Sequence, residues 1–422
     1  MVTAKQIVSG KINNNIILPV IIFFFLNIGN YSFLRYSIHG TEIPSNILNL
    51  ISGFRILLPF WIVVYSFNLH IKLTAKILLQ NIDIVALSLS WMLSGLLSLE
   101  ISSYLLYGIW TLLSLWAILL FISYTAIISQ SLPAFSLNIL RVIWYGNFVI
   151  LILDLVSLIF LKPMGGMLNI FFASNTFWAY PTMIMGILAL INIRFTPASL
   201  VKKLYYLAVL ILSVIAVYFS ARRSPLFCLI LTIPLLYFPL KSPQIILIIF
   251  LFISSYSFID STTGKHLLAS LPDSYMKYRI ERMFGLVQGR TETSYSGRQK
   301  IWDIYLDAFY EKPVMGEGLA AVNRITENIK NKDERLSAHN TFIGLLAETG
   351  LAGTLLLFVV MLRSIFLAGR MRSAIWTKIY IILFIPTLLI NWVEYNLIPG
   401  QVFFLYTMII WLLPRGLQYL KI

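Results

Sequence analysis

The sequence predicts an all-α integral membrane protein with about twelve transmembrane helices and one large, partly helical hydrophilic loop. Hydrophobic residues make up 59% of the 422 residues and charged residues only 12%, and the mean hydropathy is +0.84. These values lie far outside the usual range for a soluble domain. A spanning helix needs about 20 mostly apolar residues, and such segments recur from Ile16 to Leu413. We therefore expect a single membrane domain over residues 1–422.

The predicted spans follow from the apolar runs and from the polar residues that separate them. We expect helices near residues 16–34, 49–67, 82–98, 102–123, 140–161, 168–191, 204–220, 225–239, 244–259, 341–362, 377–392 and 399–413. The first run is followed by no small-residue cleavage site, so we interpret it as a retained helix rather than a signal peptide. The one long polar segment, residues 260–338, lies between the ninth and tenth helices.

Most basic residues fall on one side of this helix map, and that side should be cytoplasmic. They are Lys5, Lys11, Lys72, Lys76, Arg141, Arg194, Lys202, Lys203, Lys241, Arg363, Arg370, Arg372, Lys378, Arg415 and Lys421. The short loops of the other side carry only Arg35, Lys162, Arg222 and Arg223, with Arg55 at a helix edge. Both termini would then be cytoplasmic, and loop 260–338 would lie outside.

The net charge of +15 has the same explanation and does not indicate nucleic-acid binding. Eleven of the seventeen acidic residues lie in the outer loop, where they nearly balance its twelve basic ones. The single cysteine, Cys228, sits in an apolar run, which excludes an internal disulfide and favours a packing role. None of the four histidines has metal-ligand spacing, so we predict no metal.

A helix is predicted inside the outer loop, from about Arg298 to Glu311. Ser296 begins a Ser-x-x-Gln capping signature, apolar residues then recur at helical spacing, and Pro313 ends the pattern. Arg298 would occupy the first turn, where the helix dipole disfavours a cation by up to about 1 kcal/mol unless an anion is bound. A solvated surface arginine is the alternative.

Arg222 and Arg223 form a second candidate anion site, because Ser224-Pro225 is a good start for the eighth helix. The pair breaks the positive-inside trend, which an anionic head group or a pyrophosphate would explain. Two arginines that reach the membrane interface without a specific ligand are the alternative.

His339 lies where the outer loop meets the tenth helix. Histidine can accept a proton from a hydroxyl near neutral pH, and a helix-capping or interfacial role is the alternative. Glu348, nine residues later, would lie about 13 Å further along the helix on roughly the opposite face. We therefore expect Glu348 to pack against another helix or to support the site indirectly.

Three further acids lie in predicted spans or at their ends, namely Asp83, Asp154 and Glu394. An ionisable group inside the membrane suggests function, and Asp154 is the deepest of the three. A structural pairing of Asp154 with a polar group of a neighbouring helix is an equal alternative.

Three motifs together resemble the shared region of bacterial O-antigen polymerases and O-antigen ligases over residues 296–353. They are Ser296-Gly-Arg298-x-x-Ile-Trp302, Pro313-x-x-Gly316-x-Gly318, and His339-Asn340 followed by Glu348-x-Gly350-x-x-Gly353. The resemblance implies a membrane glycosyltransferase of C-type architecture in the bacterial inner membrane. It would use undecaprenyl-pyrophosphate-linked glycans and need neither a metal ion nor another cofactor.

The same resemblance implies roles for individual residues. His339 would be the catalytic base, and Arg298 with one of Arg222 or Arg223 would bind the pyrophosphate. Arg282 would be a further loop arginine, and Asn340 and Glu348 would support the site. Aromatic residues of the loop could stack on sugars or form its core, and the amphipathic pattern favours the core for Trp302. They are Tyr275, Tyr278, Tyr295, Trp302 and Tyr305.

The resemblance fits polymerases and ligases alike; of the two we favour a polymerase, whose donor and acceptor are both lipid-linked repeat units. An O-antigen ligase, which transfers the glycan to the lipid A core, is the alternative. A lipid-linked oligosaccharide flippase is a third hypothesis, and a scaffold without catalysis a fourth. Membrane lipids and a chain-length regulator protein are the expected partners.

Overall fold

The computed structural model describes part of the chain, and all secondary structure in that part is helical. The described residues are 79–97, 112–113, 116, 119–120, 122–129, 134–160, 175–219, 223–237, 270, 294–319, 321, 325–326, 338–393 and 402–418. The chain divides into two compact units, Met1–Val142 with Ser294–Ile422, and Ile143–Thr293. All three motifs belong to the first unit.

Three of the described helices are long and apolar enough to cross a membrane. They are Leu200–Phe219, Thr341–Gly369 and Ala374–Trp392, with mean hydropathies of 2.1, 2.2 and 1.7. This confirms a helical fold for the described residues, three of whose helices could span a membrane by length and composition. The predicted helices at 16–34, 49–67 and 244–259 lie outside them.

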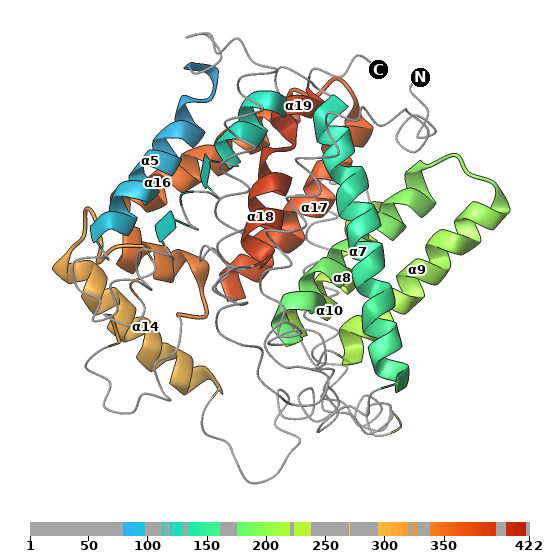
Figure 1. The fold of residues 1–422 in the computed structure, drawn as a ribbon, viewed down its shortest axis with the longest axis horizontal. Helices are drawn as coiled ribbons and strands as arrows, with labels where there is room; N and C mark the ends of the chain where they lie inside the picture. The colour runs from blue at the N-terminus through green and yellow to red at the C-terminus, as the bar shows by residue number, and fades with distance from the viewer. Residues whose placement is uncertain are drawn as a thin grey trace, which may run out of the picture. The chain divides into compact units, whose positions relative to one another are not determined.

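The first unit is built around α16 (Thr341–Gly369), which packs against α5, α14, α17 and α19 (Figure 1). The other helices of this unit are α5 (Ile82–Leu97), α14 (Ser294–Glu311), α17 (Ala374–Val393), α18 (Val402–Leu412) and α19 (Pro414–Leu417). α7 (Ala134–Phe160) begins in this unit and ends in the other. The bounds of α5, α17 and α18 agree with the predicted spans to within three residues.

The second unit contains α8 (Asn175–Phe195), α9 (Leu200–Phe219) and α10 (Arg223–Tyr237), which all contact one another. Cys228 is 1% exposed on α10, which confirms the predicted packing role. A Cβ at Gly186 of α8 would lie 2.7 Å from the Leu229 side chain, so the missing side chain lets α8 and α10 approach closely.

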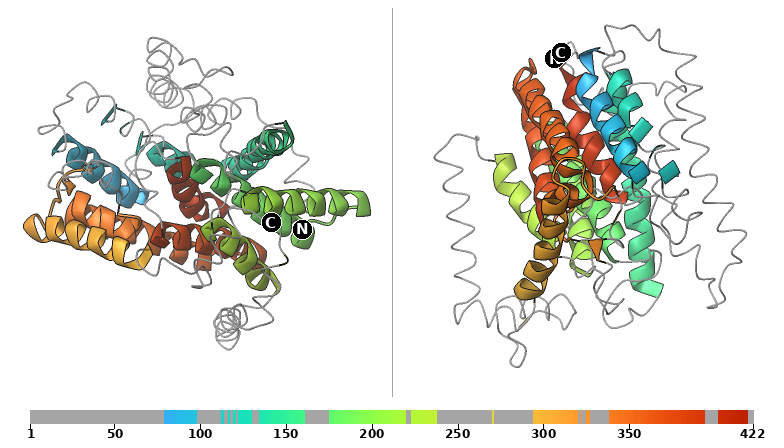
Figure 2. Two further views of the ribbon diagram at one scale, coloured as in Figure 1. Left: turned by 90° about the horizontal axis from the view of Figure 1, so that it is seen from below. Right: turned by 90° about the vertical axis from the view of Figure 1, so that its left-hand side faces the viewer.

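α14 lies against the first half of α16, as the views of Figures 1 and 2 show. Tyr305 of α14 is fully buried against Ala338 and Ala347, and neighbouring apolar residues of α14 pack around it. The helix ends at Glu311, before Pro313, as predicted. It begins at Ser294, however, so Ser296 is inside the helix and Arg298 lies in the second turn. The prediction that Arg298 occupies the first turn is therefore wrong.

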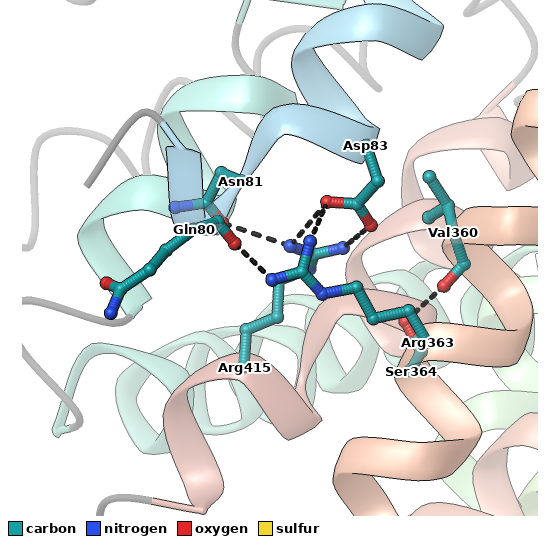
Figure 3. A network of polar contacts seen from close by, with 7 residues as sticks. All are labelled: Gln80, Asn81, Asp83, Val360, Arg363, Ser364 and Arg415. Carbon is teal, nitrogen blue, oxygen red and sulfur yellow. Dashed lines mark hydrogen bonds and ion pairs between the residues drawn. The ribbon is translucent and has the colours of Figure 1, made fainter. Parts of the chain in front are cut away.

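At the start of α5, Asp83 forms a charge cluster with Arg363 of α16 and Arg415 of α19 (Figure 3). Its Oδ1 accepts hydrogen bonds from Arg363 Nη1 at 2.6 Å and from Arg415 Nη1 at 3.2 Å, and its Oδ2 accepts from Arg415 Nη2. Asn81 and the Gln80 carbonyl accept further guanidinium hydrogen bonds. Asp83 thus joins three helices of the first unit, and this gives it a structural role.

Candidate active site

α16 is broken at Gly350, whose backbone has φ 62° and ψ −165°. The break interrupts the helical hydrogen bonds and frees backbone groups of the residues on either side. In an apolar environment each unsatisfied backbone group costs several kcal/mol. A break inside an apolar helix therefore requires other partners for these groups.

The partners come from the docking turn, which we define as residues 312–319 between α14 and α16. Four backbone hydrogen bonds join it to the break. Two run from the turn to carbonyls before the break: Glu317 N–H donates to the Ala347 carbonyl and Gly318 N–H to the Glu348 carbonyl, both at 2.8 Å. The other two run from amides after the break to the turn: Leu351 N–H donates to the Pro313 carbonyl at 2.8 Å and Ala352 N–H to the Val314 carbonyl at 3.1 Å. The turn thus satisfies both the carbonyls before the break and the amides after it.

Two glycines make this close approach possible. Gly316 and Gly350 both have positive φ, a conformation that L side chains disfavour. A Cβ at Gly316 would lie 2.5 Å from the Glu348 carbonyl carbon, and a Cβ at Gly350 would collide with the Val314 carbonyl. The glycines of two motifs therefore face each other across one backbone contact.

α5 covers another side of the break. Ser94 Oγ donates to the Glu348 carbonyl at 3.1 Å, and the Trp91 indole donates to the Gly353 carbonyl at 3.3 Å. Glu348 itself is fully buried. Its backbone carbonyl thus contacts α5 and the docking turn, in agreement with the prediction that Glu348 lies against another helix.

His339 directly precedes α16 and has a φ of +49°, the only positive φ of a non-glycine residue in the described part of the chain. Such a conformation persists only where the surroundings hold it. On one side Asn340 is the N-cap, and its Oδ1 accepts hydrogen bonds from Phe342 N at 2.9 Å and Ile343 N at 3.2 Å. On the other side the Ala338 carbonyl accepts the Trp302 indole N–H at 2.7 Å. His339 is thus held between two fixed residues.

A buried chain of hydrogen-bonded polar side chains connects the start of α16 to α17 and α18. Thr341 Oγ1 lies 3.1 Å from Asn391 Oδ1 of α17, and Asn391 Nδ2 donates to Thr407 Oγ1 of α18 at 3.1 Å. All three residues are 0% exposed. No motif marks these residues, because isolated Thr and Asn in apolar runs give no distinctive sequence signal.

Tyr305 of α14 is buried in a cluster with Ala338 and Ala347. Burial, together with the negative charge of Glu348, raises the pKa of its phenol. Tyr305 therefore stays neutral through the physiological range and serves as a packing residue rather than as a sugar-stacking surface. Trp302 is partly buried, and its bond to Ala338 agrees with the core role predicted for it.

The predicted arginines are distributed over both units. Arg298 belongs to α14, and the helical repeat puts it one turn before Trp302 on the same face of that helix. Arg223 is the first residue of α10 in the second unit. Arg222 and Arg282 lie outside the described residues, and Asp154 belongs to α7.

This part of the first unit has a histidine at the start of α16, a helix packed against α16 that carries an arginine, and a buried glutamate within α16. Among the described residues, no group of three or more His, Cys, Asp or Glu could hold a metal ion. In general, an imidazole can transfer a proton near neutral pH and a guanidinium can bind an anion.

No protein-family model matches the chain, and the search of curated proteins gives no match either.

Proposed function

We propose that this chain is a membrane glycosyltransferase that joins undecaprenyl-pyrophosphate-linked oligosaccharide units into a surface polysaccharide at the periplasmic face of the bacterial inner membrane. One observation carries the proposal. The three motif segments contact one another: Trp302 bonds to Ala338, next to His339 with its strained backbone, and the docking turn bonds to the break at Gly350. Residues held in strained conformations cluster at functional sites.

In the proposed reaction, each proton transfer and each bond change has a defined donor and acceptor. His339 takes the proton of an acceptor sugar hydroxyl, whose oxygen then attacks the anomeric carbon of the donor sugar. The new C–O bond forms as the bond to the pyrophosphate breaks, and the pyrophosphate leaves with the electron pair. Attack from the face opposite the leaving group inverts that carbon.

The leaving pyrophosphate gains negative charge, which fixed cations stabilise. Arg298 supplies a guanidinium group that can bind phosphate oxygens with two parallel hydrogen bonds. The family resemblance would add one of Arg222 or Arg223. Two such groups would perform the charge stabilisation that a metal ion provides in other glycosyltransferases.

The test uses a strain that lacks this gene and the lipopolysaccharide ladder on a gel. Core that carries a single repeat unit supports a polymerase. Bare core, with long glycan still attached to undecaprenyl pyrophosphate, would instead identify an O-antigen ligase. An unchanged ladder would contradict both functions for lipopolysaccharide.

Complementation then tests the residues. His339→Ala and Arg298→Ala should fail to restore the ladder at normal expression, whereas His70→Ala should restore it. The last variant is a matched control, because His70 lies on the predicted cytoplasmic side, away from the reaction. Full activity of His339→Ala would contradict the assignment of the base.

A further inference from the structure

The peptide between Ala338 and His339 is one of the points where α14 contacts the chain at the start of α16. Ala338 is 0% exposed, and the Trp302 indole donates to its carbonyl at 2.7 Å. The next residue, His339, has a φ of +49°. The φ angle of His339 is the rotation about its N–Cα bond, which directly follows this peptide. At this φ, a fixed peptide plane therefore fixes the direction in which the histidine side chain leaves the backbone.

We propose that Trp302 is a positioning residue for His339, and that it acts through the hydrogen bond to the Ala338 carbonyl. The inference rests on the proposed function, because it assigns to Trp302 the orientation of the proposed base. It goes beyond a packing role, since the N–H donor and not the volume of the ring would be needed.

The position of Trp302 on α14 gives the same bond a second consequence. Arg298 lies one turn earlier on the same face of α14. The indole therefore connects the helix that carries the proposed pyrophosphate-binding arginine to the residue that precedes the proposed base. Loss of the bond would change the separation of these two groups, and a misplacement of about 1 Å can reduce a rate about a hundredfold.

The test compares variants of the purified full-length protein on lipid-linked repeat units extracted from a strain that lacks this gene. Trp302→Phe removes the donor and keeps an aromatic ring. Incorporation of 3-(3-benzothienyl)alanine at position 302 replaces the N–H by sulfur at nearly constant shape. We expect kcat to fall by about tenfold to a hundredfold in both, with KM for the lipid-linked donor within about twofold.

Trp116→Phe is the matched control. The Trp116 indole also donates to a backbone carbonyl, that of Met92 at 3.3 Å, and is also partly buried. This variant loses the same type of bond and leaves the bond between Trp302 and Ala338 in place, so its kcat should be unchanged.

The outcomes distinguish failure of the role proposed for Trp302 from failure of the proposed function. If His339→Ala is inactive and the benzothienyl variant keeps its kcat, the role of Trp302 is refuted while the proposed function stands. Equal losses in the position 302 and position 116 variants would show a general structural effect and would also refute it. If His339→Ala remains active, the proposed base and the inference fail together.

Discussion

Substitution of Asp83 by Asn should be one of the most destabilising isosteric changes in the first unit. The carboxylate lies between two guanidinium groups, and its side chain is 4% exposed (Figure 3). Asn keeps the shape but removes the charge. Arg415, whose side chain is 0% exposed, would then be a buried cation without a carboxylate partner.

The magnitude follows from the contacts. Asp83 accepts three guanidinium hydrogen bonds, two from Arg415 and one from Arg363, and a hydrogen bond to a charged group contributes about 1.5–3 kcal/mol. Arg363 is 30% exposed and regains water when its partner is lost, so its share is reduced. We therefore expect Asp83→Asn to lower the free energy of unfolding by about 3–5 kcal/mol, as for other broken buried ion pairs.

The assay is unfolding by a denaturing detergent in mixed micelles, followed by the helical circular dichroism signal. Asp307→Asn on the exposed face of α14 is the control and should change the free energy by less than about 0.5 kcal/mol. The double variant Asp83→Asn with Arg415→Met should be more stable than Asp83→Asn alone, because it also removes the unpaired buried cation.

Two results would refute this reasoning. A loss below about 1 kcal/mol for Asp83→Asn would mean that Arg415 finds water or another acceptor at no cost. Additive losses in the double variant would mean that Asp83 and Arg415 do not interact across the cluster.

Three further predictions concern the docking turn, the buried tyrosine and the lone cysteine. Gly350→Ala should reduce stability and, under the proposed function, glycan polymerisation, because its Cβ would collide with the Val314 carbonyl. Gly369→Ala, where a Cβ meets nothing within 4 Å, is the control in the same assays. Above pH 10 the unfolded chain loses the Tyr305 proton while the folded chain keeps it, so the free energy of unfolding should fall with rising pH by up to about 1.4 kcal/mol per pH unit for this group. Tyr305→Phe should fall less steeply between pH 10 and 11 in a denaturation series, and an identical slope would contradict the burial argument. Cys228, 1% exposed, should not react with a maleimide until the protein unfolds, and rapid labelling of the native protein would contradict its packing in α10.

Local signals in the sequence predict where helices begin and end better than they predict which helices contact one another. Pro313 correctly marks the end of α14, and His339-Asn340 marks the start of α16. The predicted start of α14 was wrong, because the Ser-x-x-Gln signature that begins at Ser296 also fits inside a helix. A capping pattern specifies side-chain chemistry, but where the helix begins also depends on how α14 packs against α16.

The break in α16 could not be predicted, although its glycines are visible in the sequence. Gly350 inside an apolar run is compatible with a continuous membrane helix, and nothing local shows that residues 312–319 supply the missing hydrogen bonds. The charge cluster is harder still, since Asp83 and Arg415 are 332 positions apart. Their pairing depends on how α5, α16 and α19 pack together.

The two ends of α16 are held by different forces, and this bears on where a reaction site can form. Near one end Arg363 is held by a carboxylate, in a part of the predicted map where Asp83 is the only acid among many lysines and arginines. At the other end, backbone hydrogen bonds from the docking turn hold the break. The part after the break, residues 351–369, is about 28 Å long and can by itself cross a hydrocarbon core of about 30 Å. The part before it can therefore lie at the membrane surface, which is the level at which two lipid-linked substrates would reach His339 under the proposed function.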